Sequence, residues 1–285
     1  PARNKDLGPM IRSLFLPERN HTWGCFDYSQ QEPRLVVHYA AASPKLREDE
    51  EVKDIVSRFN SDDVDFHQTV ADMAGIERIQ AKTINLGLFY GMGKAKLQAE
   101  LGLSTKEEAE KLFDKYHSRV PFVKDLMNNT SKDSQIRGYI TTLLGRKCRF
   151  NSWEVNEYNP GVLTPATTKA EAESESLSKQ AEEVKKRNEY KLELKEITEE
   201  EVEKEIEKLR PRIRRAFTYK ALNKLIQGSA ADMTKKAMLD LYEEKIIPHI
   251  QIHDELDVSV ESKNHADKII DIMQNAVKLH VPNKV

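Results

Sequence analysis

The stretch IPHIQIHDELDVSV, Ile247–Val260, alternates apolar and polar residues like a half-buried β-strand. Near its middle it carries two adjacent acids, Asp254 and Glu255. Asp254 falls on the apolar parity, where an isolated ionised carboxylate is too costly to keep. It must therefore be protonated, paired with a cation, bound to metal, or moved to water by a turn. The apolar residues of that parity are Ile250, Ile252, Leu256, Val258 and Val260.

A second acid, Asp27, follows another short apolar run in TWGCFDYS, Thr22–Ser29, which also predicts a strand. If the fold brings the two strands together, Asp27 and Asp254 offer the carboxylate oxygens that Mg²⁺ prefers. Acids at strand ends are also common in plain turns that bind nothing. From the two strands alone, the sequence favours the plain turn.

The composition is that of a globular protein: 285 residues, of which 39% are hydrophobic. No apolar run approaches the roughly 20 residues that cross a bilayer, and the first residues lack the layout of a signal peptide. Cys25 and Cys148 are distant from each other and have no His at metal spacing, which argues against a disulfide framework or a zinc site. We expect a cytoplasmic protein with no membrane partner. The absence of an initiator Met suggests a fragment of a longer chain.

The net charge of −2 conceals one unusual segment. Residues 160–210 hold 14 Glu against 10 Lys and Arg, and the rest of the chain holds 35 basic and 33 acidic residues. This segment predicts an exposed helix or helical hairpin inserted into a host domain, with Val202, Ile206 and Leu209 along one face. A solvated insertion without function is the simpler interpretation, because loops accept long insertions at small entropic cost. The alternative is a docking arm, whose partner the sequence does not identify.

The remaining patterns do not alternate as βαβ units, so they favour an α+β fold with a small antiparallel sheet. Helices are expected over 33–42, 66–74, 78–101, 106–115 and 216–245, and a short hairpin over 139–150. Four parts are expected along the chain. They are a first part of one lobe at 1–65, a helical lobe at 66–158, the charged insertion at 159–211, and the rest of the first lobe at 212–285.

The predicted helix that begins at Arg78 carries a stripe of residues spaced by four: Arg78, Lys82, Leu86 and Tyr90. Its two cations suit a triphosphate and its ring suits a base. An ordinary amphipathic helix can show the same spacing. The glycines directly after Tyr90, and His67 shortly before Arg78, are not expected from such a helix.

These residues lie in stretches that resemble the motifs of family A DNA polymerases, the group of bacterial DNA polymerase I and its phage relatives. DYSQQEPR (27–34), RIQAKTINLGLFYG (78–91) and QIHDELDV (251–258) resemble the three polymerase motifs, in the same order. RGYITTLLGRK (137–147) and NKLIQGSAADM (223–233) resemble two further stretches. The family implies a palm, built here from 1–65 and 212–285 around the small antiparallel sheet, and helical fingers at 66–158. The resemblance leaves the charged insertion unmatched, and it identifies the chain as a palm and fingers fragment of a phage-type enzyme.

The resemblance implies that this fragment belongs to a template-directed, primer-dependent DNA polymerase working in a bacterial or phage-infected cytoplasm. Asp27 and Asp254 match the metal-binding aspartates of the family, the backbone carbonyl of Tyr28 is a further ligand, and Glu255 is the neighbouring motif acid. Together they would hold two Mg²⁺ ions that activate the primer 3′-hydroxyl and stabilise the leaving pyrophosphate. Lys82 matches the proton donor to that pyrophosphate.

Seven residues match the nucleotide-binding positions of the family. Arg78, Lys82 and His67 would grip the phosphates of the incoming dNTP, with Gln30 nearby. Glu32 and Tyr90 would close the space that a ribose 2′-hydroxyl needs, which implies a preference for deoxynucleotides. The implied nucleotide-binding residues are Arg78, Lys82, His67, Gln30, Glu32, Leu86 and Tyr90.

The implied partners are primer–template DNA and dNTPs, with Asn223, Gln227 and His253 matching residues at the minor groove and the primer end. Leu86 departs from the aromatic usual in the family, which puts rate and fidelity in doubt but not catalysis. Gln31 and Pro33 also depart from the family, whose residues around Glu32 are apolar.

Three other functions are compatible with parts of the pattern. A two-metal nuclease or phosphatase would explain Asp27 and Asp254 but has no use for the stripe that begins at Arg78. A nucleic-acid-binding relative without catalysis would tolerate the loss of an acid, and both acids are present. A single-subunit RNA polymerase shares the acids and the cationic helix, but Glu32 argues against it.

Overall fold

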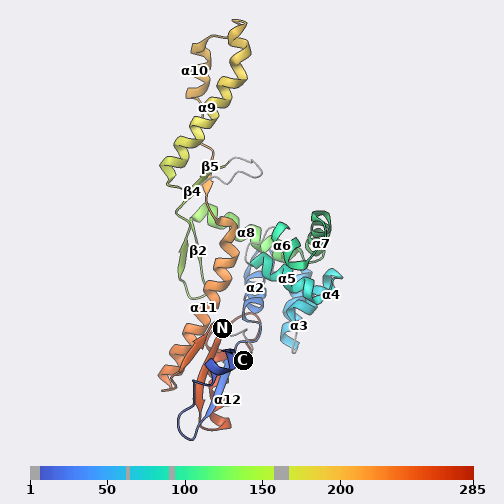
Figure 1. The fold of residues 1–285 in the computed structure, drawn as a ribbon, viewed down its shortest axis with the longest axis vertical. Helices are drawn as coiled ribbons and strands as arrows, with labels where there is room; N and C mark the ends of the chain where they lie inside the picture. Colours follow the sequence, from blue (N-terminus) through green and yellow to red (C-terminus); the bar gives the residue numbers. More distant parts are fainter. Residues whose placement is uncertain (1–6, 62–64, 90–93, 157–166) are drawn as a thin grey trace. The chain divides into compact units, whose positions relative to one another are not determined.

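The computed structural model describes residues 7–61, 65–89, 94–156 and 167–285 (Figure 1). It has the expected α+β character, with small antiparallel sheets among many helices. The chain divides into two compact units: Pro1–Asn128, Thr141–Arg146 and Leu222–Val285 form the first, and Asn129–Ile140 and Lys147–Ala221 form the second. These units divide the chain by contacts, and the four-part functional division stays a prediction.

A three-stranded antiparallel sheet lies in the first unit, with the strand order β1 (Thr22–Asp27), β7 (Glu255–Val260), β6 (Ile250–Ile252). β1 and β7 are the two predicted acid-bearing strands, and they are direct neighbours in which Asp27 pairs with Glu255. A tight turn at His253 and Asp254 joins β6 to β7, and His253 takes a positive φ of 58° there. The turn therefore carries Asp254 out of both strands.

The turn also breaks the apolar parity of the sequence pattern. Leu256, Val258 and Val260 are buried in the core as expected. Ile250 and Ile252 instead pair with Asp257 and Glu255, on the opposite face of the sheet, and Ile252 is half exposed. The prediction that all the apolar residues of this stretch lie on one face of a single strand is thus wrong, because the chain reverses between residues 252 and 255 and the even-numbered residues change to the other face of the sheet.

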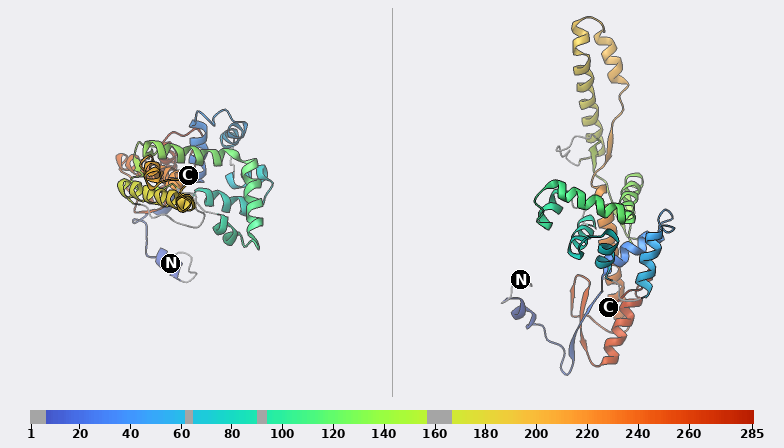
Figure 2. Two further views of the ribbon diagram at one scale, coloured as in Figure 1. Left: turned by 90° about the horizontal axis from the view of Figure 1, so that it is seen from above. Right: turned by 90° about the vertical axis from the view of Figure 1, so that its right-hand side faces the viewer.

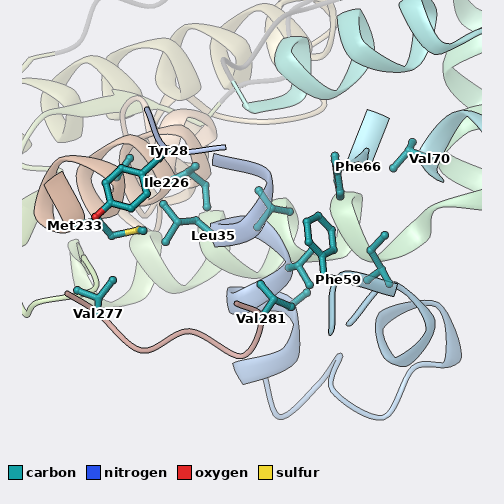
Figure 3. Close-up of a cluster of buried hydrophobic side chains, with 14 of the residues drawn as sticks. Tyr28, Leu35, Phe59, Phe66, Val70, Ile226, Met233, Val277 and Val281 are labelled. Carbon is teal, nitrogen blue, oxygen red and sulfur yellow. The ribbon is translucent and has the colours of Figure 1, made fainter. Parts of the chain in front are cut away.

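The core of the first unit surrounds α2 (Gln31–Ala42), whose buried face carries Leu35 (Figure 3). Arg34 is 2% exposed, and it donates from Nε to the carbonyl of Ser29 and from one guanidinium nitrogen to Pro282. Its guanidinium also lies 5.0 Å from the ring centroid of Phe59. These contacts tie the start of α2 to the C-terminal residues, which suits a fully buried charge that must be hydrogen-bonded.

The helices expected at 33–42, 66–74 and 106–115 are present in the first unit, which also contains helices that the sequence did not predict. The helix expected over 78–101 corresponds to α5, which ends at Phe89, and α6, which begins at Lys94, and the glycine-containing residues 90–93 between them lie outside the described residues. The helix expected to begin at 216 begins at 221, after a 3₁₀ turn. The helices are α1 (Leu7–Arg12), α3 (Glu50–Ser61), α4 (Phe66–Ala74), α5 (Arg78–Phe89), α6 (Lys94–Leu101), α7 (Lys106–Arg119), α8 (Pro121–Arg137), which runs into the second unit, α11 (Ala221–Glu243) and α12 (Lys263–Asn275). None of these helices, nor any other in the part of the chain that the structure describes, is long and apolar enough to span a membrane.

The loop 142–146 docks on the middle of α11. The backbone N–H of Leu143 donates to Ser229 Oγ, and Arg146 donates to the carboxylate of the buried Asp232 and to the carbonyl of Gly228. A Cβ on Gly228 would lie 2.6 Å from Cγ2 of Thr142. This close approach explains a glycine inside a long helix.

We expect Gly228→Ala to lower the free energy of unfolding. The overpacking penalty of about 1–3 kcal/mol exceeds the gain in helix propensity of about 1 kcal/mol. Urea unfolding measures the change. The matched control adds Thr142→Ser, which removes the clashing methyl group and keeps the hydroxyl that donates to the backbone carbonyl of Arg146. Stability should return in the double variant, and an unchanged or more stable single variant would contradict the clash.

The second unit contains the charged segment, which forms the helical hairpin that the sequence predicted as one of two options. Figure 2 shows α9 (Lys169–Glu193) and α10 (Glu199–Glu207) side by side. Of the apolar residues expected along one face, Val202 in α10 is buried, whereas Ile206 and Leu209 are only half buried. The hairpin stands on β4 (Trp153–Val155) and β5 (Ile213–Arg215), which pair antiparallel. The predicted short hairpin is present as β2 (Tyr139–Thr141) and β3 (Lys147–Arg149).

Candidate functional site

Two acids come together at the end of the three-stranded sheet. Asp27 is the last residue of β1, and Asp254 lies in the β6–β7 turn beside Glu255, the partner of Asp27 across the strands. Partial burial and then the charge of Asp254 raise the pKa of Asp27 above its ordinary value. The two carboxylates are therefore close enough to repel each other, although 227 positions separate them in the sequence.

The backbone after Asp27 is held in place by Tyr28. Its ring is 2% exposed, and its hydroxyl donates to the carbonyl of Met273 at 2.7 Å. The bond anchors the side chain of Tyr28, the residue whose backbone carbonyl is a metal ligand according to the family resemblance. The carbonyl of Tyr28, the carboxylate at the end of β1 and the carboxylate in the β6–β7 turn are all oxygen donors, the kind that Mg²⁺ prefers.

Asp254 lies at the edge of a cavity of about 520 Å³. Three predicted site residues line the same cavity: Glu32 from the first turn of α2, Gln227 from α11 and His253 from the turn. Gln31 lines it too and is 5% exposed, with its amide near the Ala230 carbonyl and Thr234 Oγ1 at 3.4 and 3.3 Å. Gln31, a departure from the family, thus ties α2 to α11 on one wall of the cavity.

Gln30 connects this cavity wall to the helices that follow. It takes a left-handed conformation at φ 56° just before α2, and its Oε1 accepts from the N–H of Phe66 at 2.8 Å. That amide belongs to the first residue of α4. Gln30 therefore joins the start of α2 to the start of α4, and its side chain is engaged in this link.

His67, Arg78 and Lys82 form a cluster on α4 and α5. Burial is the main cause that lowers the pKa of His67, and the charges of Lys82 and Arg78 lower it further, against the opposing effect of Asp65. The cations must lie near the imidazole for this to occur. The three predicted phosphate-binding residues are thus brought together.

Asp65 organises this cluster and was not predicted. Its Oδ1 caps α4 by accepting from the N–H groups of His67 and Gln68, and its Oδ2 accepts from Arg78 Nε at 2.8 Å. Partial burial acts to raise the pKa of Asp65, but the hydrogen bonds from Arg78, Gln68 and His67 and the charge of Arg78 outweigh it and lower the pKa. An Asp just before a helical pattern is a capping signal that could have found it.

A buried hydrogen-bond chain orients His67. The hydroxyl of Tyr116 donates to Oδ1 of Asn85, so the amide nitrogen of Asn85 is the group that faces Nδ1 of His67, at 3.2 Å. Asn85 and Tyr116 are fully buried. In the neutral ring Nδ1 then accepts, and the proton is on Nε2, available to a ligand. Asn85 lies within the motif stretch of α5, whereas nothing in the sequence singles out Tyr116.

The remaining predicted residues are placed only in part. Asn223 and Gln227 are one turn apart on α11, where Gln227 is exposed and Asn223 is half buried. Lys82 is exposed on α5. Leu86 belongs to α5, but the structure does not describe its side chain, and Tyr90 lies outside the described residues.

Beside the acids lies a cysteine that the sequence did not connect with them. Cys25 pairs with Asp257 across β1 and β7. Partial burial, a hydrogen bond with Asp257 and the charges of Asp257 and Glu255 raise the pKa of the Cys25 thiol to about 11. The thiol is thus part of the acidic end of the sheet.

Comparison with known proteins gives matches along the whole chain. The model of DNA polymerase family A matches residues 1–285, a range that includes the charged insertion. A DNA-directed DNA polymerase of Pseudomonas phage M6 is 31% identical over 324 residues, covering 100% of this chain and 40% of the relative. DNA polymerase I of Caldicellulosiruptor bescii is also 31% identical, over 297 residues, covering 97% of this chain and 27% of the relative.

A solved structure supports the fold. The POL domain of Pol1 from M. smegmatis, in complex with DNA primer-template and dNTP, has a TM-score of 0.66 and 24% identity, covering 99% of this chain and 41% of that chain. The chain spans less than half the length of these relatives. Since the family model matches over residues 1–285, the full length of the chain, the chain belongs to DNA polymerase family A.

Proposed function

We propose that the parent protein of this chain carries out template-directed, primer-dependent DNA synthesis, transferring nucleotides from dNTPs to a primer 3′-hydroxyl. The observation that carries the proposal is that Asp27 lies close to Asp254, which lines a cavity together with Glu32 and Gln227. Membership of family A supports it. The expected partners are primer–template DNA and dNTPs, and the expected setting is the cytoplasm of a bacterium or a phage-infected host.

The acids fit a metal-dependent reaction. Asp27 and Asp254 repel each other, and divalent cations would relieve that repulsion. In this proposal Asp27, Asp254 and the carbonyl of Tyr28 hold two Mg²⁺ ions, with Glu255 beside them. When bound, such ions lower the pKa of an attacking hydroxyl and neutralise charge on the leaving pyrophosphate.

The cationic cluster would bind the phosphates of the incoming nucleotide. Arg78 and Lys82 offer charge-assisted hydrogen bonds, and His67 offers its Nε2 proton. Lys82 is exposed, so it can reach a ligand and donate a proton to the departing pyrophosphate. Gln30 supports this group through its bond to the start of α4.

The cavity would hold the sugar of the incoming nucleotide and the primer end. Glu32 would exclude a ribose 2′-hydroxyl, together with Tyr90, and Leu86 would lie by the sugar. Gln227, His253 and Asn223 would contact the minor groove and the primer end. The division into a palm at 1–65 and 212–285, fingers at 66–158 and an insertion at 159–211 is part of the proposal.

A primer-extension experiment with the parent protein tests the proposal. A labelled primer on a DNA template is incubated with Mg²⁺ and one dNTP at a time. We expect extension only with the complementary dNTP and none after chelation of the metal. If the primer is shortened and never extended, and the protein used carries no exonuclease domain, the site is that of a nuclease. Synthesis that starts without a primer, or that uses ribonucleotides, would indicate an RNA polymerase.

Tyr116→Phe tests the hydrogen-bond chain to His67. It removes one buried hydrogen bond, worth about 0.5–1.5 kcal/mol, so the KM for the incoming dNTP should rise by about two- to tenfold. Steady-state kinetics give this value. In a His67→Ala background the same change should have little further effect on KM, because there is no imidazole left to orient. Equal effects in both backgrounds would show that Tyr116 acts on the fold alone.

A further inference from the structure

Three potential ligand groups cluster on one face of the three-stranded sheet. Cys25 on β1 pairs directly with Asp257 on β7, and Glu255 lies two residues from Asp257 on the same strand, so all three side chains point to one face. Their ligand atoms, Cys25 Sγ and one carboxylate oxygen each from Glu255 and Asp257, lie within 4.8 Å of one another. Neither Cys25 nor Asp257 belongs to the proposed Mg²⁺ site.

The burial of Asp257 independently points to a bound cation. Its side chain is 4% exposed, and its Oδ1 has no hydrogen-bond partner among the residues that the structure describes. A buried carboxylate oxygen that lacks a partner costs free energy, and a second carboxylate nearby adds repulsion. A bound cation would supply the missing partner and neutralise both acids.

The kind of cation follows from the ligands. Mg²⁺ takes oxygen ligands, whereas a thiolate with two carboxylates suits Zn²⁺ and similar ions such as Co²⁺. With bond lengths of about 2.0–2.3 Å, neighbouring ligands of a tetrahedral site lie about 3.5 Å apart. The cluster therefore needs a contraction of about an ångström, which the exposed Cys25 and the half-exposed Glu255 can supply by small side-chain rotations.

We propose that Cys25, Glu255 and Asp257 bind one divalent cation of the Zn²⁺ type, which displaces the proton of the Cys25 thiol into the solvent and leaves a fourth position open to water. The sequence argued against a zinc site because no His or Cys stands at metal spacing near Cys25. The ligands instead come from two strands 230 positions apart in the chain, and their approach depends on the register that pairs Cys25 with Asp257.

A Co²⁺ titration of the reduced, metal-free parent protein tests this site. Thiolate-to-cobalt charge transfer gives an absorption band that reports on Cys25, and excess Mg²⁺ keeps the acids at 27 and 254 occupied. We expect a Cys25-dependent band that saturates at one Co²⁺ per chain and that Zn²⁺ abolishes by displacement. The band should be lost in Cys25→Ser and kept in Cys148→Ser, the matched control. Asp257→Asn should raise the Kd for Co²⁺ by at least about tenfold.

The outcomes that overturn the site are equally definite. A band that persists in Cys25→Ser places the ion elsewhere, and the absence of any band shows that the thiol binds no such ion. An unchanged Kd in Asp257→Asn removes the buried carboxylate from the site. Both substitutions keep the size of the side chain, and equal melting temperatures without metal would show that they fold. The titration needs neither DNA nor dNTP, so its result is independent of whether the protein synthesises DNA.

Discussion

Asp254→Asn in the parent protein should reduce the rate of nucleotide incorporation by at least about a thousandfold. The carboxylate is one of two that would hold the metal ions, whose electrostatic effect on the transition state amounts to several kcal/mol, at about 1.4 kcal/mol for each factor of ten. Single-turnover primer extension measures the loss. Extension by this variant at a rate near that of the wild type would show that Asp254 is not part of the reaction centre.

The same substitution should leave the fold intact and slightly raise the Tm of the metal-free protein. The pKa of Asp27 is raised in the folded state, so its stabilising contribution is lost as the pH rises through that pKa, and at neutral pH the ionised group destabilises the fold. Replacing Asp254 with an amide would remove the charge that repels Asp27. Partial burial, the larger cause of the raised pKa of Asp27, would remain. A clear fall in Tm would mean that the loss of activity reports unfolding instead.

Glu32→Ala should have the second large effect, on the choice of sugar. Glu32 lies in the first turn of α2 and lines the cavity with Asp254 and His253, where the ribose of an incoming nucleotide would have to fit. Shortening the side chain opens space for a 2′-hydroxyl, so the preference for deoxynucleotides should fall by at least about tenfold. The ratio of kcat/KM for a dNTP and the matching ribonucleotide gives the number.

Glu32→Gln is the matched control, because it keeps the size of the side chain and removes its charge. If Glu32 acts by size, this variant should retain most of the sugar selectivity. Equal loss in the Gln and Ala variants would instead indicate that the charge is what matters. No change with Ala would show that Glu32 does not contact the sugar.

The main elements of the site could be predicted from the sequence because short patterns carried them. The strands ending in Asp27 and beginning at Glu255 have clear apolar runs, and the resemblance of their motifs to one family implied that they meet. In the structure Asp27 lies close to Asp254, and Asp254 shares a cavity with Glu32, Gln227 and His253. The assigned roles of these residues stay predictions.

Other features depend on contacts that no local pattern encodes. Alternation alone placed Ile252 on the face of Leu256, because the apolar–polar alternation of the sequence continues through the two-residue turn although the turn exchanges the faces. The pairing of Cys25 with Asp257 depends on the strand register, and the support of His67 by Tyr116 depends on helix packing. The late start of α11 follows the 3₁₀ turn, which begins after Phe217 adopts a positive φ.

The central claim is that Asp27 and Asp254 act as one metal-binding centre for DNA synthesis, and a double-variant comparison tests it most directly. Single-turnover incorporation of one complementary dNTP is measured in Mg²⁺ for wild type, Asp27→Asn, Asp254→Asn and the double variant. Groups that work as a unit are strongly non-additive, so we predict that each single variant loses nearly all activity and that the double variant is hardly slower than either. Losses that multiply, or a single variant that keeps a substantial rate, would contradict the account.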